Sequence, residues 1–68
     1  MFTIEDAQNL KSLNDEVEYL EIFYSLVKSN VIDCDVKEFN AMLSALNQYR
    51  IARMKLLNKK IVNQVNNY

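Results

Sequence analysis

The chain contains neither glycine nor proline, and this absence restricts its fold more than any other feature of the sequence. Glycine supplies the positive φ angles that tight turns need, and proline ends or interrupts regular elements. A sheet of several strands joined by hairpin turns is therefore disfavoured, and a small number of long helices is favoured. Because 68 residues are enough for one domain only, we expect a single all-α domain over residues 1–68.

The spacing of apolar residues predicts a first helix over residues 4–28. Thr3 can cap its N-terminus, and Glu5 and Asp6 lie in the first turn, where the helix dipole favours acidic side chains. Apolar residues then recur at alternating spacings of three and four, which is typical of a helix with one buried face. This face consists of Leu10, Leu13, Val17, Leu20, Tyr24 and Val27.

A second helix is predicted over residues 36–66, after a short joint. Asp35 followed by Glu38 is a capping-box pattern for its N-terminus. Asn30 can take the left-handed conformation that ends a helix when glycine is missing. Because the joint is short, the two helices should fold back on each other as an antiparallel two-helix hairpin.

The distribution of charge supports the antiparallel arrangement. The first 35 residues carry eight acidic and two basic side chains, whereas the rest of the chain carries one acidic and six basic side chains. In an antiparallel hairpin, residues 5–6 approach Lys59 and Lys60, and residues 15–16 approach Arg50. Each exposed pair contributes only about 0–1 kcal/mol, but together the pairs favour this arrangement over a parallel one.

The second helix carries more apolar side chains than one neighbouring helix can cover. Projected at about 100° per residue, they fall on two sides roughly 120° apart. The side expected to pack on the first helix consists of Val36, Phe39, Leu43, Leu46, Met54, Leu57, Ile61 and Val65. The side that then lacks a neighbour in the same chain consists of Met42, Ala45, Tyr49, Ala52 and Leu56.

We interpret the uncovered side as a dimer interface. Contiguous exposed apolar surface marks interaction sites, and chains of this size commonly gain stability from a partner chain. Two hairpins would form a four-helix bundle, in which Ala45 and Ala52 allow close approach and Tyr49 buries its ring. The alternative interpretation is that part of this side binds a different protein.

Two arginines lie among the apolar residues of the second helix. The simplest interpretation of Arg50 is that its stem packs on the hairpin and its guanidinium pairs with Asp15 or Glu16. The functional interpretation is that Arg50 and Arg53, together with Tyr49, bind an acidic partner protein, because a planar guanidinium can bind a carboxylate in a bidentate way.

The side chains needed for catalysis or metal binding are scarce. The chain has no histidine, the usual acid–base catalyst near neutral pH, and its single cysteine excludes an intrachain disulfide. We interpret Cys34 as a structural residue that forms a hydrophobic staple with Phe39, rather than as a reactive thiol. We therefore predict no catalytic residues, no metal, no cofactor and no small-molecule substrate.

Nucleic-acid binding is the alternative function. The basic residues that would carry it are Arg50, Arg53, Lys55, Lys59 and Lys60. A dimeric helical hairpin with these residues resembles, in shape and without a shared motif, the plasmid-encoded Rop type, which implies RNA binding. The net charge of −1 and the isoelectric point of about 5.2 speak against it, since nucleic-acid-binding domains usually carry a basic excess.

The sequence favours a small cytoplasmic interaction protein. Met1 is followed by Thr3, Ile4 and acidic residues rather than by a leader, and no apolar stretch could span a membrane. We expect a homodimer that acts as a regulator or antagonist by binding the surface of another protein. An accessory protein of a phage or mobile element would match this size and composition.

Overall fold

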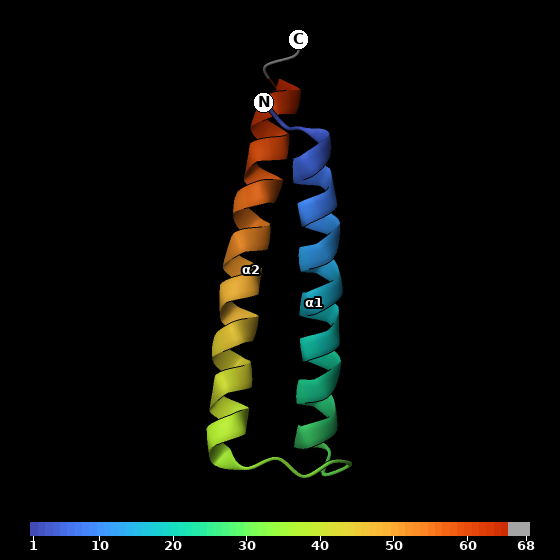
Figure 1. Cartoon of the computed structure of the whole chain (residues 1–68), viewed down its shortest axis with the longest axis vertical. Helices are drawn as coiled ribbons and strands as arrows, with labels where there is room; N and C mark the ends of the chain where they lie inside the picture. The colour runs from blue at the N-terminus through green and yellow to red at the C-terminus, as the bar shows by residue number, and fades with distance from the viewer. Residues whose placement is uncertain (66–68) are drawn as a thin grey trace.

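The computed structural model describes residues 1–65, with the side chains of residues 1–61. It is a hairpin of two antiparallel helices, α1 (Ile4–Lys28) and α2 (Val36–Val65), which lie side by side as a rod of 50 × 17 × 16 Å (Figure 1). The all-α hairpin and both predicted helices are confirmed; Asn66, the predicted last residue of the second helix, lies outside the described residues. No helix in the described part is both long enough and apolar enough to cross a bilayer.

The N-terminus of α1 is closed by a complete capping box. The backbone N–H of Asp6 donates to Thr3 Oγ1 at 3.1 Å, and the backbone N–H of Thr3 donates to Asp6 Oδ2 at 3.0 Å. Two amides that the helix leaves without carbonyl partners are thereby satisfied, and the acidic side chains of the first turn oppose the helix dipole. The predicted cap at Thr3 is confirmed.

The end of α1 is closed without glycine. Asn30 adopts a φ of 60°, the left-handed conformation predicted for it. Its N–H donates to the carbonyl oxygen of Val27 at 3.1 Å, and the N–H of Val31 donates to that of Leu26 at 3.0 Å. This pair of hydrogen bonds is a Schellman motif, which reverses the chain direction directly after the last helical turn.

The N-terminus of α2 forms half of the predicted capping box. The backbone N–H of Glu38 donates to Asp35 Oδ1 at 2.7 Å, as predicted. The Glu38 carboxylate accepts a hydrogen bond from the Cys34 thiol, with Sγ and Oε2 3.9 Å apart. Asp35 therefore starts the helix, while Glu38 turns towards the loop.

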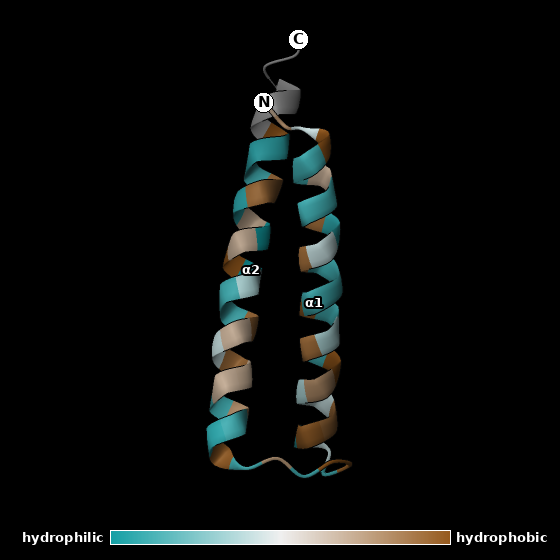
Figure 2. Cartoon of the chain, in the orientation of Figure 1, coloured by the Kyte–Doolittle hydropathy of each residue, from teal (hydrophilic) through white to brown (hydrophobic). Residues whose placement is uncertain are grey.

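The core is a single seam between the helices. Val17 is completely buried, and Leu10, Met42 and Leu46 are the other buried apolar residues of the described part. Near the loop, the rings of Tyr24 and Phe39 pack at a centroid distance of 5.7 Å. Figure 2 shows that hydrophobic residues nevertheless also occur away from the seam, on both helices.

The predicted roles of the two apolar sides of α2 were partly wrong. The buried Met42 and Leu46 come from different predicted sides, so α1 lies over the boundary between them. The physical reason is that α1 packs on the more continuous apolar stripe of α2. Spacings of three and four connect residues 39, 42, 46, 49, 53 and 56, of which only Arg53 is charged, and match the stripe of α1. The side that was expected to be buried is interrupted more often, by Asn40, Asn47 and Arg50.

Candidate interaction surfaces

One apolar stripe of α2 remains uncovered by α1, and we call it the outer stripe. It consists of Leu43, Met54, Leu57 and Ile61, whose exposed fractions are 37, 60, 39 and 56%. All four were expected in the hairpin core. Val36 is more exposed still, and the side chain of Val65 lies outside the described residues. The surplus of apolar surface predicted for α2 is therefore present, but on the side that was expected to pack on the first helix.

The five residues predicted for a dimer interface lie in the seam or beside it in a single copy. Met42 is buried, and Ala45, Ala52 and Leu56 are half-buried. Tyr49 is the most exposed of these five residues, with an exposed fraction of 36%. α1 of the same copy therefore already shelters part of this set, while Tyr49 stays accessible.

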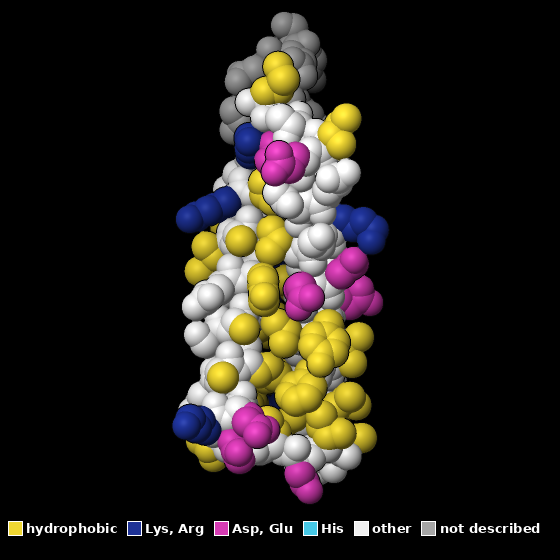
Figure 3. All heavy atoms as spheres, viewed as in Figure 1, with side chains coloured by type: hydrophobic (Ala, Val, Ile, Leu, Met, Phe, Trp, Pro, Cys, Tyr) yellow, Lys and Arg dark blue, Asp and Glu magenta, His cyan; other side chains and the backbone are white. Residues whose placement is uncertain are grey.

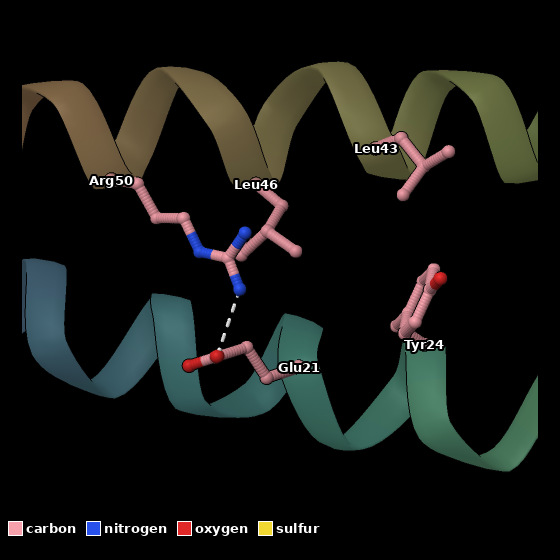
Figure 4. Close-up of a pocket in the computed structure, with 5 residues that line it drawn as sticks. All are labelled: Glu21, Tyr24, Leu43, Leu46 and Arg50. Carbon is pink, nitrogen blue, oxygen red and sulfur yellow. Dashed lines mark hydrogen bonds and ion pairs between the residues drawn. The ribbon is translucent and has the colours of Figure 1, made fainter.

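A pocket of about 410 Å³ lies beside the outer stripe. It is lined by Glu21 and Tyr24 of α1 and by Leu43, Leu46 and Arg50 of α2. In Figure 4 the Arg50 side chain reaches across to Glu21 at one end, and Tyr24 faces Leu43 at the other. The pocket thus has apolar walls and an ion pair at one end.

Arg50 pairs with a different acidic residue from the one predicted. Its Nη2 donates to Glu21 Oε2 at 2.9 Å, and both side chains are about half exposed. The prediction of Asp15 or Glu16 was wrong, because Glu21 follows the buried Val17 by one turn just as Arg50 follows the buried Leu46. Both therefore flank the seam on the same face. Asp15 pairs instead with Lys11 on α1 at 3.1 Å.

The predicted proximity of residues 5–6 to the last basic residues is confirmed for Asp6. Lys59 Nζ lies 2.7 Å from Asp6 Oδ2, and only 15% of the Asp6 side chain is exposed. The hydrogen bond from Lys59, helped by the backbone N–H of Thr3, holds the pKa of Asp6 below its ordinary value. The cap of α1 and the far end of α2 are thereby joined.

The other basic residues of α2 are arranged as follows. The Lys60 ammonium lies over the Phe2 ring, 6.0 Å from its centroid, in a cation–π contact. Arg53 is half-buried, since it lies in the seam stripe, and Lys55 is exposed. Of the five residues predicted for nucleic-acid binding, Arg50 and Lys59 form intrachain ion pairs.

A second hollow, of about 180 Å³, contains Cys34. It is lined by Tyr19, Leu20, Phe23, Cys34, Glu38 and Met42. Burial, followed by the charges of Glu38 and Asp35, raises the pKa of the Cys34 thiol, which keeps it protonated and favours the structural interpretation of this residue. Among the described residues, no three cysteine or acidic side chains come together as metal ligands.

Aromatic residues of α1 were missing from the predicted contact residues. Tyr19 is 62% exposed and Phe23 half-buried, and apolar side chains gather over the C-terminal half of α1 in Figure 3. At 100° per residue, Phe23 and Glu21 fall on opposite sides of Val17, so this face is opposite to the pocket beside Arg50. The signal in the sequence was the pair of aromatics one turn apart, next to the stripe of α1.

The outer stripe on one face and the exposed aromatic residues on the other are thus the surfaces with which this hairpin can make contacts. The pocket beside Arg50 and the hollow beside Cys34 are two concave parts of the described molecule. Comparison of the chain with protein-family models, with curated proteins and with solved structures finds no match.

Proposed function

We propose that this chain is a small non-catalytic interaction protein that regulates or antagonises another protein by binding its surface. The observation that carries the proposal is the outer stripe of α2. Met54, Leu57 and Ile61 follow one another at spacings of three and four, and each has more than a third of its side chain exposed. A stripe with this spacing is how an amphipathic helix enters a hydrophobic groove. Surface of this kind usually marks a contact site.

The pocket beside the outer stripe suggests what the partner provides. Its walls from Tyr24, Leu43 and Leu46 suit an apolar side chain. The ion pair of Arg50 with Glu21 is half exposed, and such pairs contribute only about 0–1 kcal/mol. A carboxylate of the partner can therefore replace Glu21 at little cost. We propose a partner segment with an apolar residue for the pocket and an acidic residue for Arg50.

Homodimerisation is the second part of the proposal. Two helices with one narrow seam bury little apolar area, and small domains of this kind usually need a further source of stability. The face with Tyr19, Phe23 and Tyr49 is separate from the outer stripe, because it lies on the other side of the seam. One face can therefore contact a second copy while the other contacts the partner protein.

Binding of RNA or DNA has less support. It would use Arg50, Arg53, Lys55, Lys59 and Lys60, of which two are paired with acidic residues of α1. The overall charge of −1 also gives little attraction for phosphates.

The test compares two variants that add the same charge at exposed apolar positions. Met54→Lys lies in the outer stripe, whereas Ile22→Lys lies on the exposed surface of α1, outside the outer stripe, and serves as the control. Tagged protein is incubated with lysate of the source cell, with and without nuclease, and captured proteins are identified. We expect one protein that survives nuclease, is retained by Ile22→Lys and is lost with Met54→Lys.

Two results would refute the proposal. Equal capture by Met54→Lys and Ile22→Lys would show that the outer stripe is not the contact surface. Loss of all captured material after nuclease would favour the nucleic-acid alternative, which should then also show binding that weakens steeply between about 50 and 200 mM salt.

A further inference from the structure

The face opposite the pocket beside Arg50 is built from large side chains on one helix and small ones on the other. Tyr19 and Phe23 project from α1, whereas Ala41 and Ala45 project from α2 on the same side of the seam. Tyr19 is 62% exposed, so one copy leaves most of its ring uncovered. We call this the aromatic–alanine face.

The contacts between the helices show which of these residues lie at the same level along the rod. Tyr24 of α1 and Phe39 of α2 are level, because their rings pack against each other. Tyr19 comes five residues before Tyr24, and Ala45 comes six residues after Phe39, so these two are also nearly level in an antiparallel hairpin. By the same register, Phe23 lies close to the level of Ala41.

Two copies related by a twofold axis can place these faces together in two ways. With the axis along the rod, both loops lie at the same end, and each α1 lies over α2 of the second copy. Each residue then lies at the same height along the rod in both copies. Tyr19 therefore contacts Ala45 of the second copy, and Phe23 contacts Ala41 of the second copy. Large side chains enter the spaces above small ones, which is how helices pack closely.

With the axis across the rod, the loops lie at opposite ends and each helix lies over its own counterpart. When the axis crosses the middle of the rod, Ala45 lies near Ala52 of the second copy, and two small side chains leave space there, which costs contact energy. Glu16 occupies the middle of α1, seven residues before Phe23 and therefore on the same face. It would lie against Glu16 of the second copy, and like charges at such positions repel.

The charges of the two helices also favour the arrangement with both loops at the same end. α1 carries six acidic and two basic residues, and α2 carries one acidic and six basic residues. With the loops together, each acidic helix lies over a basic one. With the loops apart, like-charged helices lie over each other.

We infer that a second copy covers the aromatic–alanine face, with both loops at the same end of a four-helix bundle. This inference rests on the homodimer in the proposed function and specifies its geometry. Two observations identify a second copy as the molecule that covers this face. Tyr19 and Phe23 match the alanines of α2 in size, and the helices that come together carry opposite charges.

The test measures the distance between the two loops. Asp33 is an exposed loop residue, so Asp33→Cys in a Cys34→Ser chain gives one spin-label site per copy. With the loops together, neighbouring helices are about 8–10 Å apart, and labels on the two loops should lie within about 25 Å. With the loops apart, the distance approaches the 50 Å length of the rod.

A second variant tests the packing itself. Ala45→Glu places a charge opposite Tyr19 and should convert the dimer, of about twice the 8.0 kDa chain mass, into a monomer in sedimentation. Ile51→Glu, about 120° around α2 from Ala45 and outside the aromatic–alanine face, should leave the dimer intact. Retention of the helical circular dichroism signal in both variants shows that they still fold.

Each outcome decides the inference. A short loop-to-loop distance together with a dimer that Ala45→Glu abolishes supports it. A distance near the rod length overturns the loops-together geometry while leaving a dimer in place. A chain of 8.0 kDa at micromolar concentration overturns the dimer, yet capture of a partner protein through the outer stripe would still be measurable, so the two proposals fail separately.

Discussion

The two helices of this hairpin use their apolar residues differently. α1 places its main stripe in the seam, where Leu10 and Val17 are buried. α2 buries Met42 and Leu46 in the same seam, but leaves the four residues of the outer stripe exposed on its flank. Folding of one copy therefore accounts for the stripe of α1, whereas it leaves a large part of the apolar surface of α2 without a role.

This difference separates residues that hold the hairpin together from residues that are free to make contacts. Val17 is completely buried, so a smaller side chain at this position should lower the free energy of unfolding. Leu57 and Met54 have solvent on one side, so their substitution changes mainly the surface. Predictions about stability should therefore divide along this line.

The largest effect is expected for a leucine in the seam. Leu46→Ala removes a side chain that is only 4% exposed and should lower the free energy of unfolding by about 2–3 kcal/mol. Leu57→Ala makes the same chemical change at 39% exposure and should cost less than about 1 kcal/mol. Urea denaturation followed by circular dichroism measures both. Equal losses for the two variants would remove the distinction between seam and outer stripe.

A smaller effect is expected at the start of α2. Asp35→Ala removes the acceptor of the Glu38 amide and should cost about 1 kcal/mol, the usual value of an N-cap. Asp33→Ala, in the same exposed loop, is the control and should change stability by less than about 0.5 kcal/mol. Thermal unfolding of the two variants distinguishes a loss of capping from a general loss of loop charge.

The pH dependence of stability should report on the cap of α1. The folded-state pKa of Asp6 lies below its unfolded value, so its contribution is complete above pH about 4 and is lost as the pH falls towards the lower folded value. Asp6→Asn lacks this contribution at neutral pH. The urea midpoints of the two proteins should therefore approach each other in acid, and a constant difference down to pH about 2 would contradict the assignment.

The smallest effect on stability is expected for the ion pair at the pocket. Arg50→Gln should cost less than about 1 kcal/mol, since both partners are about half exposed. The same variant should weaken partner binding by much more than it weakens folding, because the guanidinium of Arg50 is proposed to bind a carboxylate of the partner. Glu21→Gln provides the matched control: it breaks the same intrachain pair but leaves Arg50 free, so binding should be retained.

Local signals in the sequence predicted the course of the backbone. Thr3, Asn30 and Asp35 are the capping residues in the structure as predicted, and the bounds of α1 agree with the apolar spacing. Such signals depend on a few neighbouring residues, whose geometry is fixed by the helix itself. The approach of Lys59 to Asp6 followed from the antiparallel arrangement in the same way.

The face of α2 that packs on α1 was harder to predict. Two apolar stripes adjoin each other on this helix, and a projection shows their directions without showing where the neighbouring helix lies between them. The result is that Met42 is buried, whereas Met54 is exposed. Arg50 was assigned the wrong acidic residue for the same reason, since its pairing with Glu21 depends on which flank of the seam each residue occupies.

The turn after α1 has a consequence for the unfolded chain. Asn30 reaches a φ of 60° without being glycine, and no other residue of the loop is glycine. A residue with a side chain has fewer accessible backbone conformations in the unfolded chain than glycine has, so less conformational entropy is lost on folding. At the φ of 60° of Asn30, the cost of the left-handed conformation offsets part of this gain. The loop between α1 and α2 therefore samples fewer conformations in the unfolded chain. Closing the hairpin costs less conformational entropy than it would with a glycine-rich loop.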